Sequence, residues 1–268
     1  MKKIFGNIPI YWINLDSSLD RLEHMGKQLI GTNNYRISAI DGLNEKTFNE
    51  KYQIINANPL FSSGFTAVIS SHMKAIKLAS INNLDYVIIV EDKCNFEYVD
   101  NCKHSIEDII KMINKQDLSW EIILLCPVLD DYQDYINNGL KIYKKTFNLT
   151  GCNYLINKKG INKILNLIPT DGVQLFDYSN VTKAVDPERI LFDYLNSYYI
   201  NYPLFYVYSK KTTFHSYYKG QDKSFTLAIL EKHRKDVMNF FDKYNIEFKS
   251  MAVTCMLGPG MTFLKVQR

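Results

Sequence analysis

The residues best suited to chemistry end an apolar run, Val87-Ile88-Ile89-Val90-Glu91-Asp92-Lys93. The run is β-branched and has no helical periodicity, which is typical of a buried strand. Open α/β sheets bind ligands at the carboxyl ends of their strands, where paired carboxylates can hold a divalent cation that carries a diphosphate. Lys93 follows directly, and its ammonium repels such a cation. One interpretation is that Lys93 itself binds phosphate as a point charge, and the other is that it points into solvent beside a site without function.

Further polar candidates follow the neighbouring predicted strands. Residues 9–15 are predicted to form the first strand, and Asp16 and Arg21 come after it. An arginine in this position can bind a diphosphate through its fork of donors, although a capping acid and a solvated helix arginine would give the same pattern. The predicted strand over 35–40 ends at Asp41, which can contact a base or ribose or can simply form a turn with the next glycine.

The remaining elements predict a single α/β domain. Helical spacing and caps indicate helices, apolar runs indicate strands, and their alternation indicates one domain built on a largely parallel sheet. Residues 43–62 are predicted to be irregular. The predicted helices cover residues 20–30, 66–80, 105–114, 158–167 and 225–244, and further strands cover 85–90, 120–125 and 202–208.

Composition excludes several functional classes. The 268 residues carry a formal net charge of +4 with dispersed lysines, so we expect no nucleic-acid partner. The five cysteines are widely spaced and form no CxxC pair, so neither a disulfide framework nor a zinc site is predicted. The start of the chain has no signal-peptide core and no segment is apolar over a membrane-spanning length, so we expect a cytoplasmic protein. An oligomer is compatible with the sequence.

Several short segments, taken in order from about residue 8 to residue 224, resemble glycosyltransferase family 25, the lipooligosaccharide and procollagen galactosyltransferase group. No single segment is specific for this family, but the occurrence of several of them in the same order is. The segments are Ile13-Asn14-Leu15-Asp16, Asp20-Arg21, Ala39-Ile40-Asp41-Gly42, Gly64, Ser71-His72, Glu91-Asp92-Lys93, Ser119-Trp120-Glu121-Ile122-Ile123, residues 150–156, Val185-Asp186, Phe192-Asp193 and residues 221–224.

The resemblance implies a GT-A type fold, a single Rossmann-like nucleotide-sugar-binding domain over residues 1–224, with a helical extension over 225–268 packed on it. It implies transfer of a hexose from a UDP-sugar to a hydroxyl of a glycan or protein acceptor, with inversion. The rival interpretation is an inactive relative that binds a nucleotide, a glycan or a partner protein. Nucleotidyl transfer would need a Gly-rich phosphate loop that the sequence does not contain.

The resemblance also assigns roles to single residues. It makes Asp186 the general base, with Asp193 as second choice, although Asp186 before Pro187 is also a typical helix cap. It places Mn²⁺ near Asp92, with Lys93 in the position of a metal-binding acid. His72 is expected at a helix start, in a structural role that can still position the nucleotide. The residues assigned to the nucleotide sugar are Asn14, Asp16, Arg21, Asp41, His72, Glu91, Asp92 and Lys93.

Overall fold

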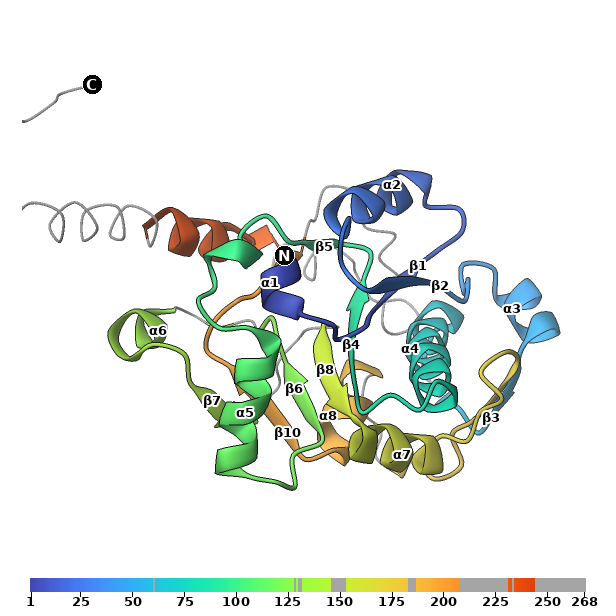
Figure 1. Ribbon diagram of the computed structural model, residues 1–268. Helices are drawn as coiled ribbons and strands as arrows, with labels where there is room; N and C mark the ends of the chain where they lie inside the picture. The colour runs from blue at the N-terminus through green and yellow to red at the C-terminus, as the bar shows by residue number, and fades with distance from the viewer. Residues whose placement is uncertain are drawn as a thin grey trace, which may run out of the picture.

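The computed structural model describes most of the chain as alternating strands and helices (Figure 1). The described residues are 1–59, 61–127, 129, 132–145, 153–182, 187–207, 231–232 and 234–243. The strands are β1 (Ile10–Asn14), β2 (Asn34–Ser38), β3 (Gln53–Ile55), β4 (Tyr86–Glu91), β5 (Cys94–Asn95), β6 (Ile122–Leu124), β7 (Ile142–Lys144), β8 (Tyr154–Asn157), β9 (Leu175–Asp177), β10 (Ser197–Ile200) and β11 (Tyr206–Val207). The helices are α1 (Lys2–Phe5), α2 (Leu19–Gln28), α3 (Glu45–Lys51), α4 (Ser63–Ile81), α5 (Ile106–Gln116), α6 (Gln133–Asn138), α7 (Lys158–Leu167) and α8 (Pro187–Tyr194), with a short 3₁₀ turn at Val99–Asn101 and further helical residues at 231–232 and 234–243.

Seven strands form one mixed sheet in the order β2-β1-β4-β8-β6-β10-β7. β2, β1 and β4 are parallel neighbours, whereas β8 runs antiparallel to β4 and β6 on either side of it. β10 is parallel to β6, and β7 is antiparallel to β10. The α/β class predicted from the sequence is confirmed, but the sheet is mixed. The carboxyl ends of β2, β1 and β4 meet at one edge.

Helices cover both faces of this sheet, so the central strands are buried on both sides. In β4, Ile88 and Val90 belong to one apolar core, and Val87 and Ile89 belong to the other. The first core packs under α1, α2 and α5, and the second packs under α4, α7 and α8 (Figure 1). Because both faces are covered, the strand is apolar without a polar alternate position.

The described part of the C-terminal helix packs on the first core. Its buried residues are Val237, Phe240 and Phe241. The ring of Phe241 stacks on Tyr98 with centroids 4.3 Å apart, and that of Phe240 lies 5.0 Å from the ring of Tyr132. This helix therefore covers core residues of the sheet domain.

The segment predicted to be irregular, residues 43–62, contains α3 and β3, so that prediction is wrong. α3 begins at an Asn44 cap, whose side chain accepts from the Thr47 N–H, and it buries only Phe48. One buried residue gives no apolar stripe to recognise. β3 pairs only with the distant β9, and such a long-range pairing leaves no local pattern.

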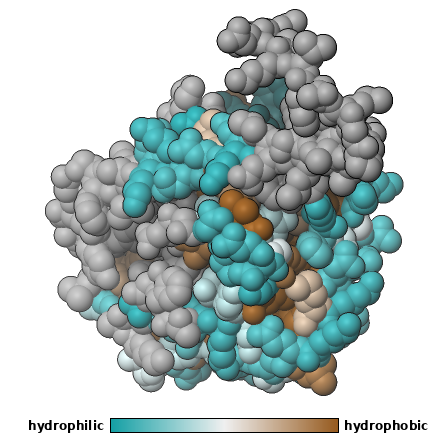
Figure 2. All heavy atoms as spheres, turned by 90° about the vertical axis from the view of Figure 1, so that its left-hand side faces the viewer, coloured by the Kyte–Doolittle hydropathy of each residue, from teal (hydrophilic) through white to brown (hydrophobic). Residues whose placement is uncertain are grey.

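The surface is mostly hydrophilic where Figure 2 shows it, with hydrophobic residues appearing in strips between hydrophilic ones. Large exposed hydrophobic side chains lie on separate elements, and such scatter is normal for a protein surface. They are Leu19, Ile30, Tyr35, Leu43, Ile81, Leu118 and Val173. Among the described residues, no helix has the length and apolar character that crossing a bilayer requires.

Candidate functional site

The parallel strands β2, β1 and β4 bring their last residues together at one edge of the sheet. Asn14 pairs in register with Ser38, and Ile13 pairs with Glu91. The Asp92 N–H donates to the Ile13 carbonyl at 2.9 Å, which extends the ladder one residue beyond β4. The acidic end of β4 therefore lies beside the end of β1.

Asp92 lies at the centre of a buried polar cluster. Its Oδ2 accepts from Nδ2 of Asn14 at 2.7 Å and from Nε of Arg21 at 3.0 Å. The side chains of Arg21 and Asp92 are only 13% and 11% exposed. Burial raises the pKa of Asp92, and the Arg21 charge and the Asn14 hydrogen bond oppose that rise. The structure thus brings these three predicted residues together, where they bind one another.

Glu91 lies between two basic side chains. Its Oε2 is 2.8 Å from Nζ of Lys93, and its Oε1 is 3.6 Å from Nε2 of His72. The other ring nitrogen of His72 shares a 3.0 Å hydrogen bond with the Tyr154 hydroxyl. His72 was predicted to lie at a helix start, and that prediction is wrong. α4 begins at Ser63, and His72 is buried in the middle of the helix.

The charges at the end of β4 compensate one another. Glu91 and Asp92 contribute two negative charges, and Arg21 and Lys93 contribute two positive charges at contact distance. Across the part of the chain that the structure describes, no group of three or more His, Cys, Asp or Glu side chains is placed to hold a metal ion. Both acids predicted to bind a diphosphate through a metal therefore have protein cations as neighbours.

A cavity of about 320 Å³ opens beside this cluster, and we call it the charged pocket. It lies beyond the ends of β1 and β2, between α3 and α4. Asp16 and Asp41, two of the residues predicted to contact a nucleotide, are in its lining. The full lining is Leu15, Asp16, Ser17, Ser38, Ala39, Asp41, Thr47, Lys51, Tyr52 and Lys74.

Hydrogen bonds fix the position of Asp16 in the charged pocket. Its Oδ2 accepts from Ser38 at 2.8 Å, and its Oδ1 accepts from the Arg36 guanidinium at 2.5 Å. These two bonds lower the pKa of Asp16, so the carboxylate stays ionised. Nε of Arg36 also donates to the Asn14 side chain at 2.9 Å, which links the charged pocket to the cluster around Asp92.

Lys74 is a residue of this pocket that the sequence interpretation missed. It lies in the fourth turn of α4, and its Nζ donates to the Ser38 carbonyl at 2.9 Å. Partial burial lowers the pKa of Lys74. The negative charge of Asp16 opposes this shift, and the positive charges of Lys51 and Arg36 add to it. Two cations, Lys51 and Lys74, therefore line the pocket with the two acids Asp16 and Asp41, and Arg36 contacts Asp16. No local pattern distinguishes Lys74 from a solvated helix lysine, so only the packing of α4 on β2 reveals it.

Gly42 allows the Asp41 loop to lie directly against the start of α4. A Cβ at this position would come within 2.4 Å of the Ser63 carbonyl oxygen and 2.6 Å of Gly64 Cα. The Ser63 hydroxyl in turn donates to the Gly42 carbonyl at 2.8 Å. This close approach holds Asp41 at the rim of the charged pocket.

The two acids considered for proton removal differ in what the structure shows. Asp186 lies outside the described residues. Asp193 contacts Nζ of Lys145 at 3.0 Å and the Arg189 guanidinium at 3.2 Å. Asp193 lies near the end of α8, just before β10 begins. β10 runs in the same direction as β4, so the start of β10 lies at the edge opposite the carboxyl end of β4. Asp193 is thus at the edge of the sheet opposite the charged pocket, which does not favour it as a base there.

Comparisons with known proteins give one family. A family model described as glycosyltransferase family 25 (LPS biosynthesis protein) matches residues 7–172, more than half of the chain. No curated protein sequence matches. Among solved structures, the chain is similar to the one titled "Crystal Structure of A197 from STIV", at 10% identity and a TM-score of 0.35, over 72% of this chain and 81% of that one.

Proposed function

Because the chain belongs to glycosyltransferase family 25, we propose that it transfers a hexose from a UDP-sugar to a hydroxyl group of a glycan or protein acceptor, with inversion. Family membership implies the glycosyltransferase activity, and the donor, the acceptor class and the stereochemistry are our proposal. The observation that carries it is the charged pocket at the carboxyl ends of β1 and β2, where an α/β sheet of this kind places its ligand.

We assign the nucleotide diphosphate of the donor to the charged pocket and its rim. Lys74 and Lys51 face this space, and their charges suit a diphosphate as point charges. Asp16 and Asp41 provide acceptors for ribose hydroxyls or base N–H groups. The GT-A arrangement of the domain over residues 1–224 is part of the same proposal.

We further propose that donor binding does not require a divalent cation. The residues at the end of β4 do not fit Mn²⁺, because Oδ2 of Asp92 already accepts from Arg21 and Asn14. Glu91 has Lys93 at contact distance. The protein's own cations then supply the positive charge that the leaving diphosphate needs. Lys93 has the structural role of compensating Glu91 in this account, rather than that of the main phosphate ligand.

The transfer step follows from the chemistry of inversion. The acceptor oxygen bonds to the anomeric carbon on the face opposite the diphosphate, the carbon–oxygen bond to UDP breaks, and the hydroxyl proton passes to a carboxylate. We assign that carboxylate to Asp186. This assignment rests on the sequence motif Val185-Asp186 alone.

A matched pair of lysine variants tests the proposal. Lys74→Met removes a cation of the charged pocket, whereas Lys77→Met makes the same change one turn further along α4, outside the pocket lining. We expect calorimetric titration to show about tenfold to a hundredfold weaker UDP binding for Lys74→Met, the usual range for a lost charged contact. The Lys77 variant should bind like the wild type. Equal affinity of both variants would contradict the assignment.

A second measurement separates the enzyme from its rival, an inactive relative. The compensated acids at the end of β4 favour that rival. Release of UDP from UDP-galactose or UDP-glucose, dependent on an added acceptor glycan, supports transfer. Tight UDP binding with no transfer to any acceptor of a broad panel would favour the inactive relative.

A further inference from the structure

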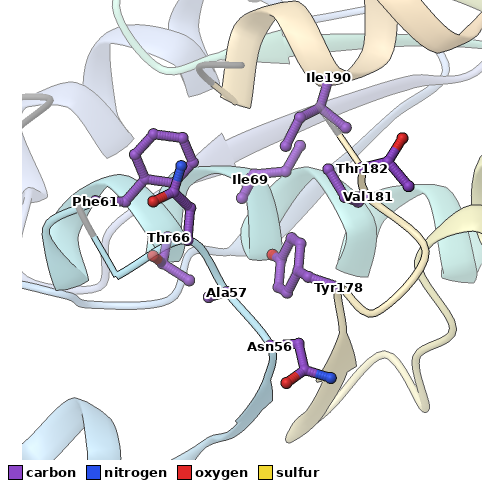
Figure 3. Close-up of a pocket in the computed structure, with 10 residues that line it drawn as sticks. Asn56, Ala57, Phe61, Thr66, Ile69, Tyr178, Val181, Thr182 and Ile190 are labelled. Atoms are coloured by element: carbon purple, nitrogen blue, oxygen red, sulfur yellow. The ribbon is translucent and has the colours of Figure 1, made fainter. Parts of the chain in front are cut away.

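A second cavity of about 230 Å³ lies near the start of α4, and we call it the neutral pocket (Figure 3). Thr66 and Ile69 enter it from α4, and Ile190 enters from α8. Figure 3 shows these side chains around a common space with Asn56 and Tyr178. The complete lining is Asn56, Ala57, Asn58, Phe61, Thr66, Ile69, Tyr178, Val181, Thr182 and Ile190.

The walls of the neutral pocket are fixed before any ligand binds. Asn56 and Tyr178 directly follow the parallel strands β3 and β9, so their side chains leave the same edge of this small sheet. The Tyr178 N–H donates to the Ile55 carbonyl at 2.8 Å, and the Tyr178 hydroxyl lies 2.8 Å from Oγ of Ser70 in α4. The Asn56 side chain donates to Oγ of Ser179 at 2.7 Å. A site held this way loses little entropy on binding.

The chemistry of the neutral pocket differs from that of the charged pocket. Phe61 and Tyr178 contribute aromatic rings, the two asparagines contribute amides, and the two threonines contribute hydroxyls. Its described lining contains no carboxylate, ammonium or guanidinium. Burial raises the pKa of Tyr178, so its phenol stays neutral at physiological pH. Rings that offer a flat apolar face, together with a few neutral hydrogen-bonding groups, match an uncharged sugar, which has an apolar C–H face and hydroxyls at its rim.

The two pockets share one helix. Thr66 of the neutral pocket and Lys74 of the charged pocket are eight residues apart in α4, which is about 12 Å along the helix axis. A diphosphate and one sugar ring can span such a distance. The Val185-Asp186 motif also directly precedes α8, whose Ile190 lines the neutral pocket.

From this arrangement we infer that the neutral pocket binds a neutral hexopyranose unit of the acceptor, stacked on Phe61 or Tyr178. The inference rests on the proposed transferase function and narrows its acceptor to an uncharged glycan. A lipid chain or a charged sugar would find fewer suitable partners in this lining.

Three variants and four small ligands test the inference. Phe61→Leu removes a ring but keeps the apolar volume, Phe61→Tyr keeps the ring, and Ala57→Leu fills the cavity. Binding of methyl β-galactoside and methyl β-glucoside is measured by NMR titration, with methyl glucuronide as the charged comparison and methyl octanoate as the apolar one. UDP affinity is measured on every variant by calorimetry.

We expect the wild type to bind at least one neutral hexoside, with about twofold to tenfold weaker binding in Phe61→Leu, the range for a lost ring contact. Phe61→Tyr should retain binding and Ala57→Leu should lose it, while all variants bind UDP equally. UDP binding without hexoside binding overturns the inference and leaves the proposed function in place. Hexoside binding that both Phe61→Leu and Ala57→Leu retain, or preferential octanoate binding, also overturns it. Failure of the wild type to bind UDP is the separate result that refutes the proposed function.

Discussion

Replacement of Arg21 by methionine should destabilise the protein in a strongly pH-dependent way. Arg21 is the cation next to the buried Asp92 carboxylate, with 3.0 Å between Nε and Oδ2. Removing one partner of a buried pair costs about 3–5 kcal/mol, because the other charge stays buried and uncompensated. The 2.7 Å hydrogen bond from Asn14 remains and keeps about 1.5–3 kcal/mol of stabilisation for the carboxylate. We therefore expect the free energy of unfolding at pH 7.5 to fall by about 1.5–2 kcal/mol, the difference between these two ranges.

The pH dependence of this loss identifies Asp92 as its cause. The folded-state pKa of Asp92 lies above its ordinary value, so the stability associated with this group is present at low pH and is lost as pH rises through that pKa. Arg21→Met raises the pKa further. The difference between wild type and variant should then be smaller at pH 4 than at pH 7.5, because protonation of the carboxyl removes the buried charge that Arg21 compensates.

Urea unfolding at both pH values measures this directly. The double variant Arg21→Met with Asp92→Asn removes the charge and should recover most of the loss. Lys27→Met is a matched control in the same helix, since Lys27 pairs with Glu23 at 2.6 Å but both side chains are mostly exposed. A loss below about 1 kcal/mol at pH 7.5, or an equal loss at both pH values, would show that Arg21 does not compensate a buried charge.

Other predictions concern packing and can be read by unfolding or chemical modification. Gly42→Ala should lower the free energy of unfolding by about 1–3 kcal/mol, because the added methyl group overpacks the contact with the start of α4. Gly26 lies inside α2 with open space around the position of a Cβ, so Gly26→Ala should stabilise the protein by up to about 1 kcal/mol. Equal effects of the two substitutions in urea unfolding would contradict the Gly42 contact. Phe241→Ala should cost about 3–5 kcal/mol in the same assay, and a loss under about 1 kcal/mol would show that the C-terminal helix does not contribute to the core. Burial raises the pKa of Cys102 to about 11 and that of Cys126 to about 12, so the folded protein at pH 8 should protect both thiols from iodoacetamide. Mass spectrometry after proteolysis measures the labelling of the buried thiols Cys94, Cys102 and Cys126, and rapid labelling of Cys102 or Cys126 would refute their burial.

The elements that the sequence predicted well have local causes. β4 is a continuous apolar run because both of its faces are buried, and α5 was placed from Ser105, which forms a capping box with Asp108. The direction of β8 was not predictable, because an apolar strand carries no mark of parallel or antiparallel pairing. α3 buries one residue and β3 pairs far along the chain, so neither leaves a periodic pattern.

The candidate site was predictable to the extent that it follows strand ends. Asn14, Asp92 and Asp41 were candidates because each lies at or shortly after the end of a strand at one edge of the sheet. Arg36 and Lys74 were missed because one lies inside a short strand and the other lies on a helix, and only the packing of α4 over β2 brings them to Asp16. The sequence also could not show that the Asp92 carboxylate has the Arg21 guanidinium as its neighbour, since the two residues come from distant elements.

In the function we propose, the charged pocket binds a nucleotide diphosphate with the protein's own cations. Calorimetric titration of the full chain with UDP, first in excess EDTA and then with Mn²⁺, tests it most directly. We expect the same affinity for UDP in both conditions and weaker binding by Lys74→Met in each. Binding that requires Mn²⁺, or no binding of UDP in either condition, would contradict it.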